Sequence, residues 1–370
     1  MDVLHPASFN DSYDYSYEDY YNMESEKEYR PCEKHEVRTF SQAFLPAFFS
    51  ITCVLSFISN LTLITIFIKS KSLRKVFPLN MVTADLLFTL TLPFWAVYAH
   101  GEWIFGPHMC KAVTVFYMVG LFSSNLFVGC LTLQKYVCVA RVCVGRLSAC
   151  RKNTLACAAV WLLSILAATP HLSFVEAHEF QGQRICSYNF MHTHGWRIYM
   201  RFQMIILGFC GPFLILLFSS CAIFRIMARR TSLPKRSRTL KLVMGFTILF
   251  FALWFPYSVV NLLHALQELH IISECVISLH LDLAIQSTEC IAFTHVCLNP
   301  LAYLLLNQKI WRKLQGKYTT SNYLISVSDS SDDGFSQKDT LELKGLQRFS
   351  SPDLDSSCTE QQGHVLPHIT

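Results

Sequence analysis

This chain of 370 residues is poor in charge and has no recognisable catalytic motif. Charged side chains make up 15% of it, whereas soluble domains usually contain about 25%. It has no phosphate-binding loop, no Gly-x-Ser-x-Gly nucleophile motif, no His-Glu-x-x-His metal motif and no cysteine spacing that suits zinc. We therefore expect neither an enzyme nor a cofactor-dependent protein, and no nucleic-acid partner.

The beginning of the chain also lacks a basic segment followed by an apolar core. Cleaved signal peptides have that pattern, so we expect none here. The first long apolar run is then expected to act as the signal anchor.

Long apolar runs are abundant: 52% of the residues are hydrophobic, and they gather in uninterrupted stretches. Each stretch reaches the ~17–25 residues that a transmembrane helix needs, and outer-membrane barrel alternation is missing. A large soluble protein with an apolar core explains such runs poorly. We predict an all-α membrane protein, a seven-helix bundle with the third run at its centre. The runs are 44–68, 77–99, 110–140, 154–174, 197–227, 239–266 and 280–306.

Lysine and arginine predict the orientation of this bundle. They are concentrated in the segments that follow the first, third, fifth and seventh runs, and the alternate segments have few. Because cytoplasmic loops carry an excess of these residues, we expect an extracellular N-terminus and a cytoplasmic C-terminus.

The N-terminal tail, residues 1–40, is predicted to be extracellular, acidic and disordered. Its first 31 residues contain eight acidic and two basic side chains, and Tyr13, Tyr15 and Tyr17 lie among the acids. Such a segment attracts a basic partner, more strongly if the tyrosines are sulfated. Asn10 begins an N-glycosylation motif, whereas a second match at Asn60 falls inside the first run.

Four of the 15 cysteines lie outside the membrane in this topology: Cys32, Cys110, Cys186 and Cys275. An even number in an oxidising compartment suggests disulfide bonds, although sequence alone does not fix their pairing. A Cys110–Cys186 bond would tie the second outer loop to the third run. A Cys32–Cys275 bond would tie the tail to the last outer loop. The other cysteines are interpreted as reduced apolar residues.

Ionisable residues within the runs are few, and such residues usually mark functional sites. Asp85 could form a central polar pocket with Ser124, His295 and Asn299, either as a water-filled structural network or as a site for a cation such as sodium. Glu289 lies about three helical turns from Asn299 towards the outside. There it could meet a cationic ligand group or an internal partner.

Two further segments follow the last run. Residues 307–318 combine apolar i, i+4 spacing with a basic face, which predicts a short amphipathic helix on membrane lipid. Residues 319–370 are rich in serine, threonine and acids and are predicted to form a disordered cytoplasmic tail, whose phosphorylation would create an anionic strip. The bundle itself is assigned to residues 41–306. Prolines are expected to kink its helices at Pro93, Pro170, Pro212, Pro256 and Pro300.

Taken together, motifs in every run resemble the rhodopsin-like G-protein-coupled receptors. They cover residues 40–317 and include Asn60, Leu79-Asn80, Asp85, Cys110, residues 134–136, Trp161, Pro212, Trp254 with Pro256, and Asn299-Pro300-Leu301-Ala302-Tyr303. Within that family the chain looks like a chemokine receptor. The signs are Thr91-Leu92-Pro93-Phe94-Trp95, Trp103-Ile104-Phe105-Gly106, the pair Cys32 and Cys275, the acidic tail and Glu289.

Residues 281–289 and the junction at 37–40 look especially like the atypical chemokine receptors of type four, which are scavengers of CC chemokines. The resemblance implies a plasma-membrane protein, also found in endosomes, that binds CC chemokines and recruits arrestin. It further implies that the chemokine N-terminus enters the bundle near Trp95, Tyr117, Tyr257, Gln286 and Glu289.

The chain departs from the signalling pattern at the inner end of the third run. Signalling members of the family have Asp-Arg-Tyr there, and this chain has Gln134, Lys135 and Tyr136. With Tyr303, these three residues are expected to face the intracellular effector. Lysine lacks the planar donor fork of arginine, so the exchange is not conservative. We predict a scavenging receptor with little or no G-protein signalling; the alternative is a signalling CC chemokine receptor coupled to an inhibitory G protein.

Overall fold

The computed structural model describes residues 35–69, 76–140, 146–180, 182–190, 194–228, 234–269, 271 and 275–307. Tyr13, Tyr15, Tyr17, Asn10 and Cys32 lie outside these residues, as do the side chain of Cys275, the predicted amphipathic helix beyond residue 307 and the C-terminal tail.

Seven helical spans, each long and apolar enough to cross a membrane, are found in the described residues, as predicted. The first is α2 (His35–Lys69), the third α5 (Gly106–Val139), the fourth α6 (Arg146–Phe174) and the sixth α9 (Pro234–Glu268). The second combines α3 (Val76–Thr89) with α4 (Leu92–His100), and the seventh combines α10 (Cys275–Phe293) with α11 (His295–Leu306). The fifth consists of α7 (His194–Gln203), a π-helix (Met204–Cys210) and α8 (Gly211–Ala228).

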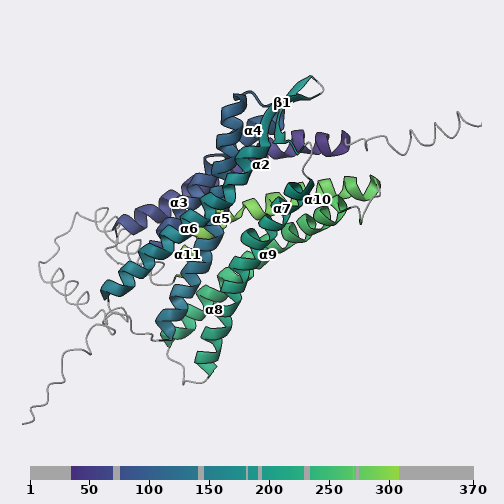
Figure 1. The fold of residues 1–370 in the computed structure, drawn as a ribbon. Coiled ribbons are helices and arrows are strands. Elements are labelled where there is room, and N and C mark those ends of the chain that lie inside the picture. The colour runs from purple at the N-terminus through teal and green to yellow at the C-terminus, as the bar shows by residue number, and fades with distance from the viewer. Residues whose placement is uncertain are drawn as a thin grey trace, which may run out of the picture.

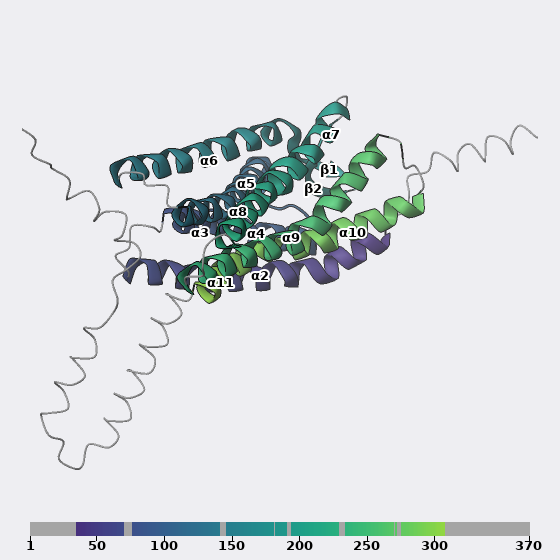
Figure 2. The same cartoon turned by 90° about the horizontal axis from the view of Figure 1, so that it is seen from below.

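Helix α5 is the central helix of this bundle. In the most apolar stretch of α5, 78% of the residues are buried, compared with 33% in the first, fourth and fifth spans. Seen from below, α5 lies between α6 on one side and α8 and α9 on the other (Figure 2). Its polar residues Ser123, Ser124 and Asn125 are almost completely buried, and other helices cover them from lipid.

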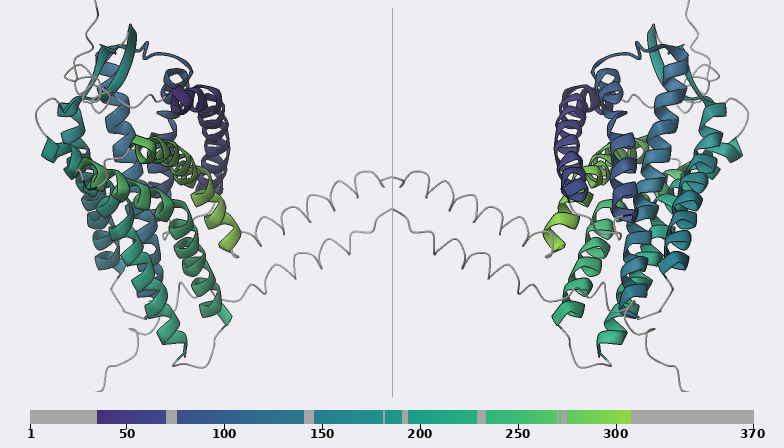
Figure 3. Two further views of the ribbon diagram at one scale, coloured as in Figure 1. Left: turned by 90° about the vertical axis from the view of Figure 1, so that its right-hand side faces the viewer. Right: turned by 90° about the vertical axis from the view of Figure 1, so that its left-hand side faces the viewer.

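One feature was not expected from the sequence: a β-hairpin formed by β1 (Val175–Phe180) and β2 (Gln183–Tyr188). The strands pair antiparallel, with Val175 opposite Tyr188 and Phe180 opposite Gln183. The hairpin lies over one end of the helices (Figures 1 and 3). We call this the hairpin end, and we call the opposite end, with Gln134, Lys135 and Tyr136, the triplet end.

The intramembrane prolines have unequal effects. The second span is interrupted between Thr89 and Leu92, just before Pro93, and the π-helix of the fifth span ends directly before Gly211 and Pro212. In contrast, Pro170, Pro256 and Pro300 lie inside α-helices that continue through them, and the break in the seventh span, at Thr294, lies six residues before Pro300.

Buried hydrogen bonds join the helices where apolar packing alone would not fix their positions. In the first span, Asn60 Nδ2 donates to Val296 O of the seventh at 2.9 Å. Trp161 Nε1 in α6 donates to Asn80 Oδ1 in α3 at 2.9 Å. Asn60 is fully buried, so its glycosylation motif is inaccessible.

Candidate functional site

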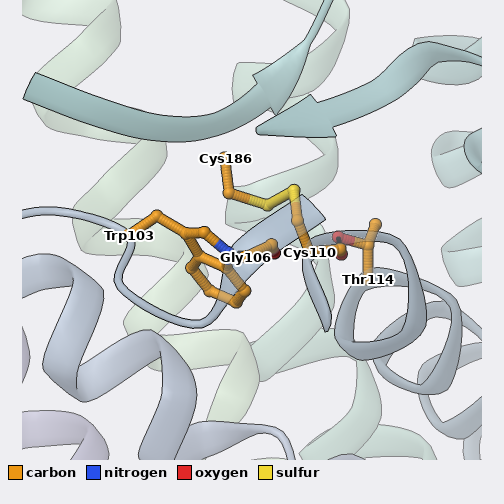
Figure 4. The surroundings of a disulfide bond; sticks show 5 residues. All are labelled: Trp103, Gly106, Cys110, Thr114 and Cys186. Carbon is orange, nitrogen blue, oxygen red and sulfur yellow. Dashed lines mark hydrogen bonds between the residues drawn. A yellow bond between two sulfur atoms is a disulfide. The ribbon is translucent and has the colours of Figure 1, made fainter. Parts of the chain in front are cut away.

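A disulfide bond between Cys110 and Cys186 joins the start of α5 to β2, with 5.7 Å between the two Cα atoms. This bond is one of the pairings considered from the sequence, and it is confirmed. It fixes the hairpin above the helices and so limits how far the hairpin can move from the bundle. Figure 4 shows the bond beside Trp103, which precedes α5.

Trp103 is the packing centre beneath this bond. It is 1% exposed, its Nε1 donates to Gly106 O at 2.8 Å, and its backbone N–H donates to Arg184 O in the hairpin at 2.8 Å. Gly106 has φ of +81°, a left-handed conformation that favours glycine. Trp103 thereby connects the segment before α5 to the hairpin.

Below the hairpin, side chains from four spans surround a polar site. Tyr117 in α5 donates from its hydroxyl to Glu289 Oε1 in α10 at 3.3 Å. Its ring centroid lies 6.2 Å from that of Trp95 in α4, and Tyr257 of α9 lies close enough to both Tyr117 and Glu289 to interact electrostatically with them. Gln286 lies one helical turn away and accepts a hydrogen bond from Ser41 of α2 at 2.8 Å.

We call this set of residues the upper pocket: Trp95, Tyr117, Tyr257, Gln286 and Glu289. Two of its polar groups could bind a ligand. Trp95 Nε1 is buried and has no hydrogen-bond partner among the residues that the structure describes. A buried N–H without a partner is costly, so it is a donor available to a bound group. The second group is the carboxylate of Glu289, which accepts the hydrogen bond from Tyr117.

Sequence reasoning missed two other contributors. Arg201 in α7 interacts electrostatically with Tyr188, Tyr257 and Glu289, so it lies beside the upper pocket. Tyr188 in β2 lies 2.6 Å from His171 Nδ1, and burial raises the pKa of Tyr188 above its usual range. Its hydroxyl therefore stays protonated and shares a hydrogen bond with His171. Nothing in the sequence pattern distinguished these residues, because each lies at the edge of a run or within a loop.

A second polar cluster lies deeper in the bundle. Ser124 donates to Asp85 Oδ1, and Asn299 Nδ2 lies 3.5 Å from the same oxygen and 3.3 Å from Ser124 Oγ. His295 Nε2 is 3.9 Å from Asp85 Oδ1. All four predicted residues therefore come together, and each is at most 6% exposed. Asp85 Oδ2 and His295 Nε2 have no hydrogen-bond partner within the described part of the chain.

At the triplet end, Gln134, Lys135 and Tyr136 are partly exposed on the last turns of α5. The ring of Tyr136 packs against Phe218 of α8, with 5.4 Å between centroids. Gln134 makes no side-chain hydrogen bond to a residue in the described ranges. Tyr303 is 4% exposed, and its ring packs against Phe67 of α2.

Residues 59–303 match the family described as the 7 transmembrane receptor (rhodopsin family). The mouse protein "Atypical chemokine receptor 2" is 33% identical over 290 residues, which is 77% of this chain and 76% of the mouse protein. The human "C-C chemokine receptor type 4" is 30% identical over 84% of this chain and 86% of its own length. The human "C-C chemokine receptor type 1" is 31% identical, over 77% and 82% respectively.

This chain belongs to the chemokine receptors of the rhodopsin family. It is therefore a multi-pass membrane receptor and not an enzyme. One of the three relatives is named as atypical and two are not, so similarity leaves open whether this receptor scavenges or signals through a G protein.

Proposed function

We propose that this receptor binds CC chemokines at its hairpin end and carries them into the cell, with little or no G-protein signalling. The observation that carries the second half of this proposal is the triplet Gln134, Lys135 and Tyr136. The upper pocket supports the first half, because it offers a carboxylate and a free indole N–H beneath a covalently fixed hairpin.

Capture would begin with the acidic tail. A basic chemokine would be steered to the outside of the receptor by the acids and by Tyr13, Tyr15 and Tyr17, which raises the association rate at low salt. The chemokine body would then rest on the tail and the hairpin. Its flexible N-terminus would enter the upper pocket, where the ammonium group meets Glu289.

The triplet explains why a bound ligand would not activate a G protein. Gln134 has no charge with which to hold a neighbouring cation, and the flexible ammonium of Lys135 cannot reproduce the five fixed donors of an arginine. The triplet lies at the opposite end of α5 from the upper pocket. A receptor that has lost G-protein coupling could therefore still bind its ligand and still be phosphorylated on its tail.

The remaining parts of the proposal concern the periphery. The hairpin end is outside the cell, Asn10 is glycosylated, and Cys32 bonds to Cys275. On the inside, the segment 307–318 lies on membrane lipid, and the phosphorylated tail binds arrestin, which directs the plasma-membrane receptor to endosomes.

For the deeper cluster we propose a sodium site. Among the described residues, Oδ2 of Asp85 has no hydrogen-bond partner and supplies a buried negative charge, and the hydroxyl oxygen of Ser124 lies beside this carboxyl group. A hard cation with oxygen ligands fits this donor set better than the water-filled network that is the alternative.

The competing function is a signalling CC chemokine receptor coupled to an inhibitory G protein. The two human relatives named as C-C chemokine receptors favour this possibility, since they match this chain over most of its length. Both functions share the fold, the upper pocket and the ligand class, and they differ in what happens at the triplet end.

The experiment measures uptake of labelled CC chemokines and G-protein dissociation in the same cells. We expect uptake without dissociation for the wild-type receptor. The matched variant Gln134→Asp/Lys135→Arg should take up the same chemokines and gain G-protein dissociation. Dissociation with the wild-type receptor would establish the signalling function instead, and no uptake of any CC chemokine would refute the ligand class.

A further inference from the structure

Arg201 is a cation beside a group of residues whose proposed anchor is an anion, Glu289. It lies on α7 of the fifth span, whereas Glu289 lies on α10 of the seventh, and the two charges interact electrostatically. A site lined by one acid and one base can recognise two opposite charges on one ligand. The proposed use of Glu289 for an ammonium group leaves Arg201 unexplained.

The contacts of Arg201 are few and loose. Its Nη1 donates to Asn261 Oδ1 at 3.2 Å, and its Nε lies 3.5 Å from Glu268 Oε1. The second distance is longer than the 2.7–2.9 Å usual for a hydrogen bond between charged groups. Because a guanidinium carries five N–H donors, most donors of Arg201 remain unused among the described residues.

Its acidic partner is also incompletely satisfied. Glu268 Oε2 is buried and has no hydrogen-bond partner in the described parts of the chain. Glu268 is the last residue of α9, so its side chain can turn outward without disturbing the helix. The side chain of Arg201 is 32% exposed, so the pair is not closed off from its surroundings. A partly exposed, imperfect ion pair of this kind contributes little stability and is readily exchanged.

We propose that Arg201 is a second ligand subsite, which binds a carboxylate in the flexible N-terminal segment of the chemokine. The ligand carboxylate replaces or joins Glu268 on the guanidinium, while the ligand ammonium binds Glu289. Arg201 then determines specificity, because it favours chemokines with an acidic residue in that segment over chemokines with a neutral or basic one. This inference rests on the proposed function, since it assumes that a CC chemokine enters the upper pocket.

The side chain of Asn261 supports this role by fixing the guanidinium. Asn261 is 1% exposed, and its Nδ2 donates to Tyr257 O within α9 at 3.0 Å, which leaves its Oδ1 directed at Arg201. A guanidinium held on one side by a neutral amide keeps its charge and its other donors for a ligand.

The test uses one CC chemokine that the wild-type receptor binds, made with Asp, Asn or Lys at each position of its N-terminal segment in turn. Affinities are measured on intact cells for the wild type, Arg201→Gln, Arg201→Lys, Arg201→Glu and Glu268→Gln, with surface expression monitored by an epitope tag. Glu289→Gln serves as the control for the other subsite.

At one position we expect the wild type to prefer Asp over Asn by about tenfold, the effect of one charged hydrogen-bonded pair. Arg201→Gln should abolish this preference, Arg201→Lys should retain part of it, and Arg201→Glu should reverse it in favour of Lys. Glu268→Gln should increase the preference for Asp, because it removes the competing carboxylate. Glu289→Gln should weaken the binding of every version by a similar factor and leave the preference intact.

Two results would overturn this inference and leave the proposed function standing. One is an Asp-over-Asn preference that is the same in Arg201→Gln as in the wild type. The other is an equal loss of affinity for all chemokine versions in both Arg201→Gln and Glu268→Gln. That result would show that the Arg201–Glu268 ion pair only stabilises the packing of α7 against α9. If no CC chemokine binds the wild-type receptor, the proposed function fails and the inference fails with it.

Discussion

The two ends of α5 are built in different ways. At the hairpin end, α5 is joined covalently to β2, and its neighbourhood contains charged side chains, hydrogen bonds between spans and an indole N–H without a partner among the described residues. At the triplet end, Tyr136 packs against Phe218, and Val139 packs with Ile223 and Val243. One long helix thus joins a polar, covalently anchored neighbourhood at one end to an apolar packing cluster at the other.

This contrast also separates the two halves of the proposed function. A polar site whose groups are positioned before binding can select and hold a ligand. Gln134 and Lys135 lie at the other end of α5, so changing them should leave that site undisturbed. Changes at the hairpin end should therefore affect binding, and changes at the triplet end should leave binding unchanged.

The largest effect should come from breaking the disulfide bond. We expect Cys110→Ala/Cys186→Ala to destabilise the folded receptor by about 2–5 kcal/mol, because the hairpin is released from α5. Surface expression, chemokine binding and thermal unfolding of the solubilised receptor would measure this loss. The control Cys221→Ala removes a free, exposed cysteine on α8 and should leave all three unchanged. Normal chemokine affinity in the double variant would show that the hairpin is held in place without the bond.

An intermediate effect is expected halfway along α5, at the Asp85 cluster. Chemokine affinity of the wild type should differ by about fivefold between sodium and potassium at equal ionic strength, and Asp85→Asn should abolish that difference. The substitution preserves size and removes only the charge that a cation needs. Ionic strength is held constant because the acidic tail responds to it as well. An identical sodium response in Asp85→Asn would refute the sodium site.

The smallest effect should come from the triplet end, at Gly245. A Cβ at this position of α9 would lie 2.5 Å from Leu306 Cδ1, so Gly245→Ala must displace the end of a flexible side chain in α11. We expect a loss of about 1 kcal/mol in the free energy of unfolding and no change in chemokine affinity. The control Gly195→Ala in α7 meets no atom within 4 Å and should not destabilise the receptor. Weaker chemokine binding by Gly245→Ala would contradict the separation of the two ends.

The sequence was sufficient for the seven spans, because bilayer thickness imposes a minimum length on each apolar run. It also predicted the Asp85 cluster and the residues of the upper pocket, since charges are rare within such runs and family motifs identify their positions. The hairpin was not predicted, because Val175–Tyr188 lies between two apolar runs. The length and composition rules for membrane-spanning helices do not apply to such a connecting segment. Arg201 was missed for a related reason: an arginine at the edge of a run looks like a residue that reaches water. Its importance depends on Asn261 and Glu268, which are 60 or more residues away in the chain.

The π-helix Met204–Cys210 has a consequence for how such receptors can diverge. A π-helix accommodates an extra residue in an α-helix, and each residue turns the helix by about 100°. Deleting one residue there would rotate α7 relative to α8 and carry Arg201 away from Asn261, while Ser220 could keep its 2.8 Å contact with Thr247. A single-codon deletion or insertion could thus exchange the whole set of fifth-span side chains presented to a ligand, with no substitution at all.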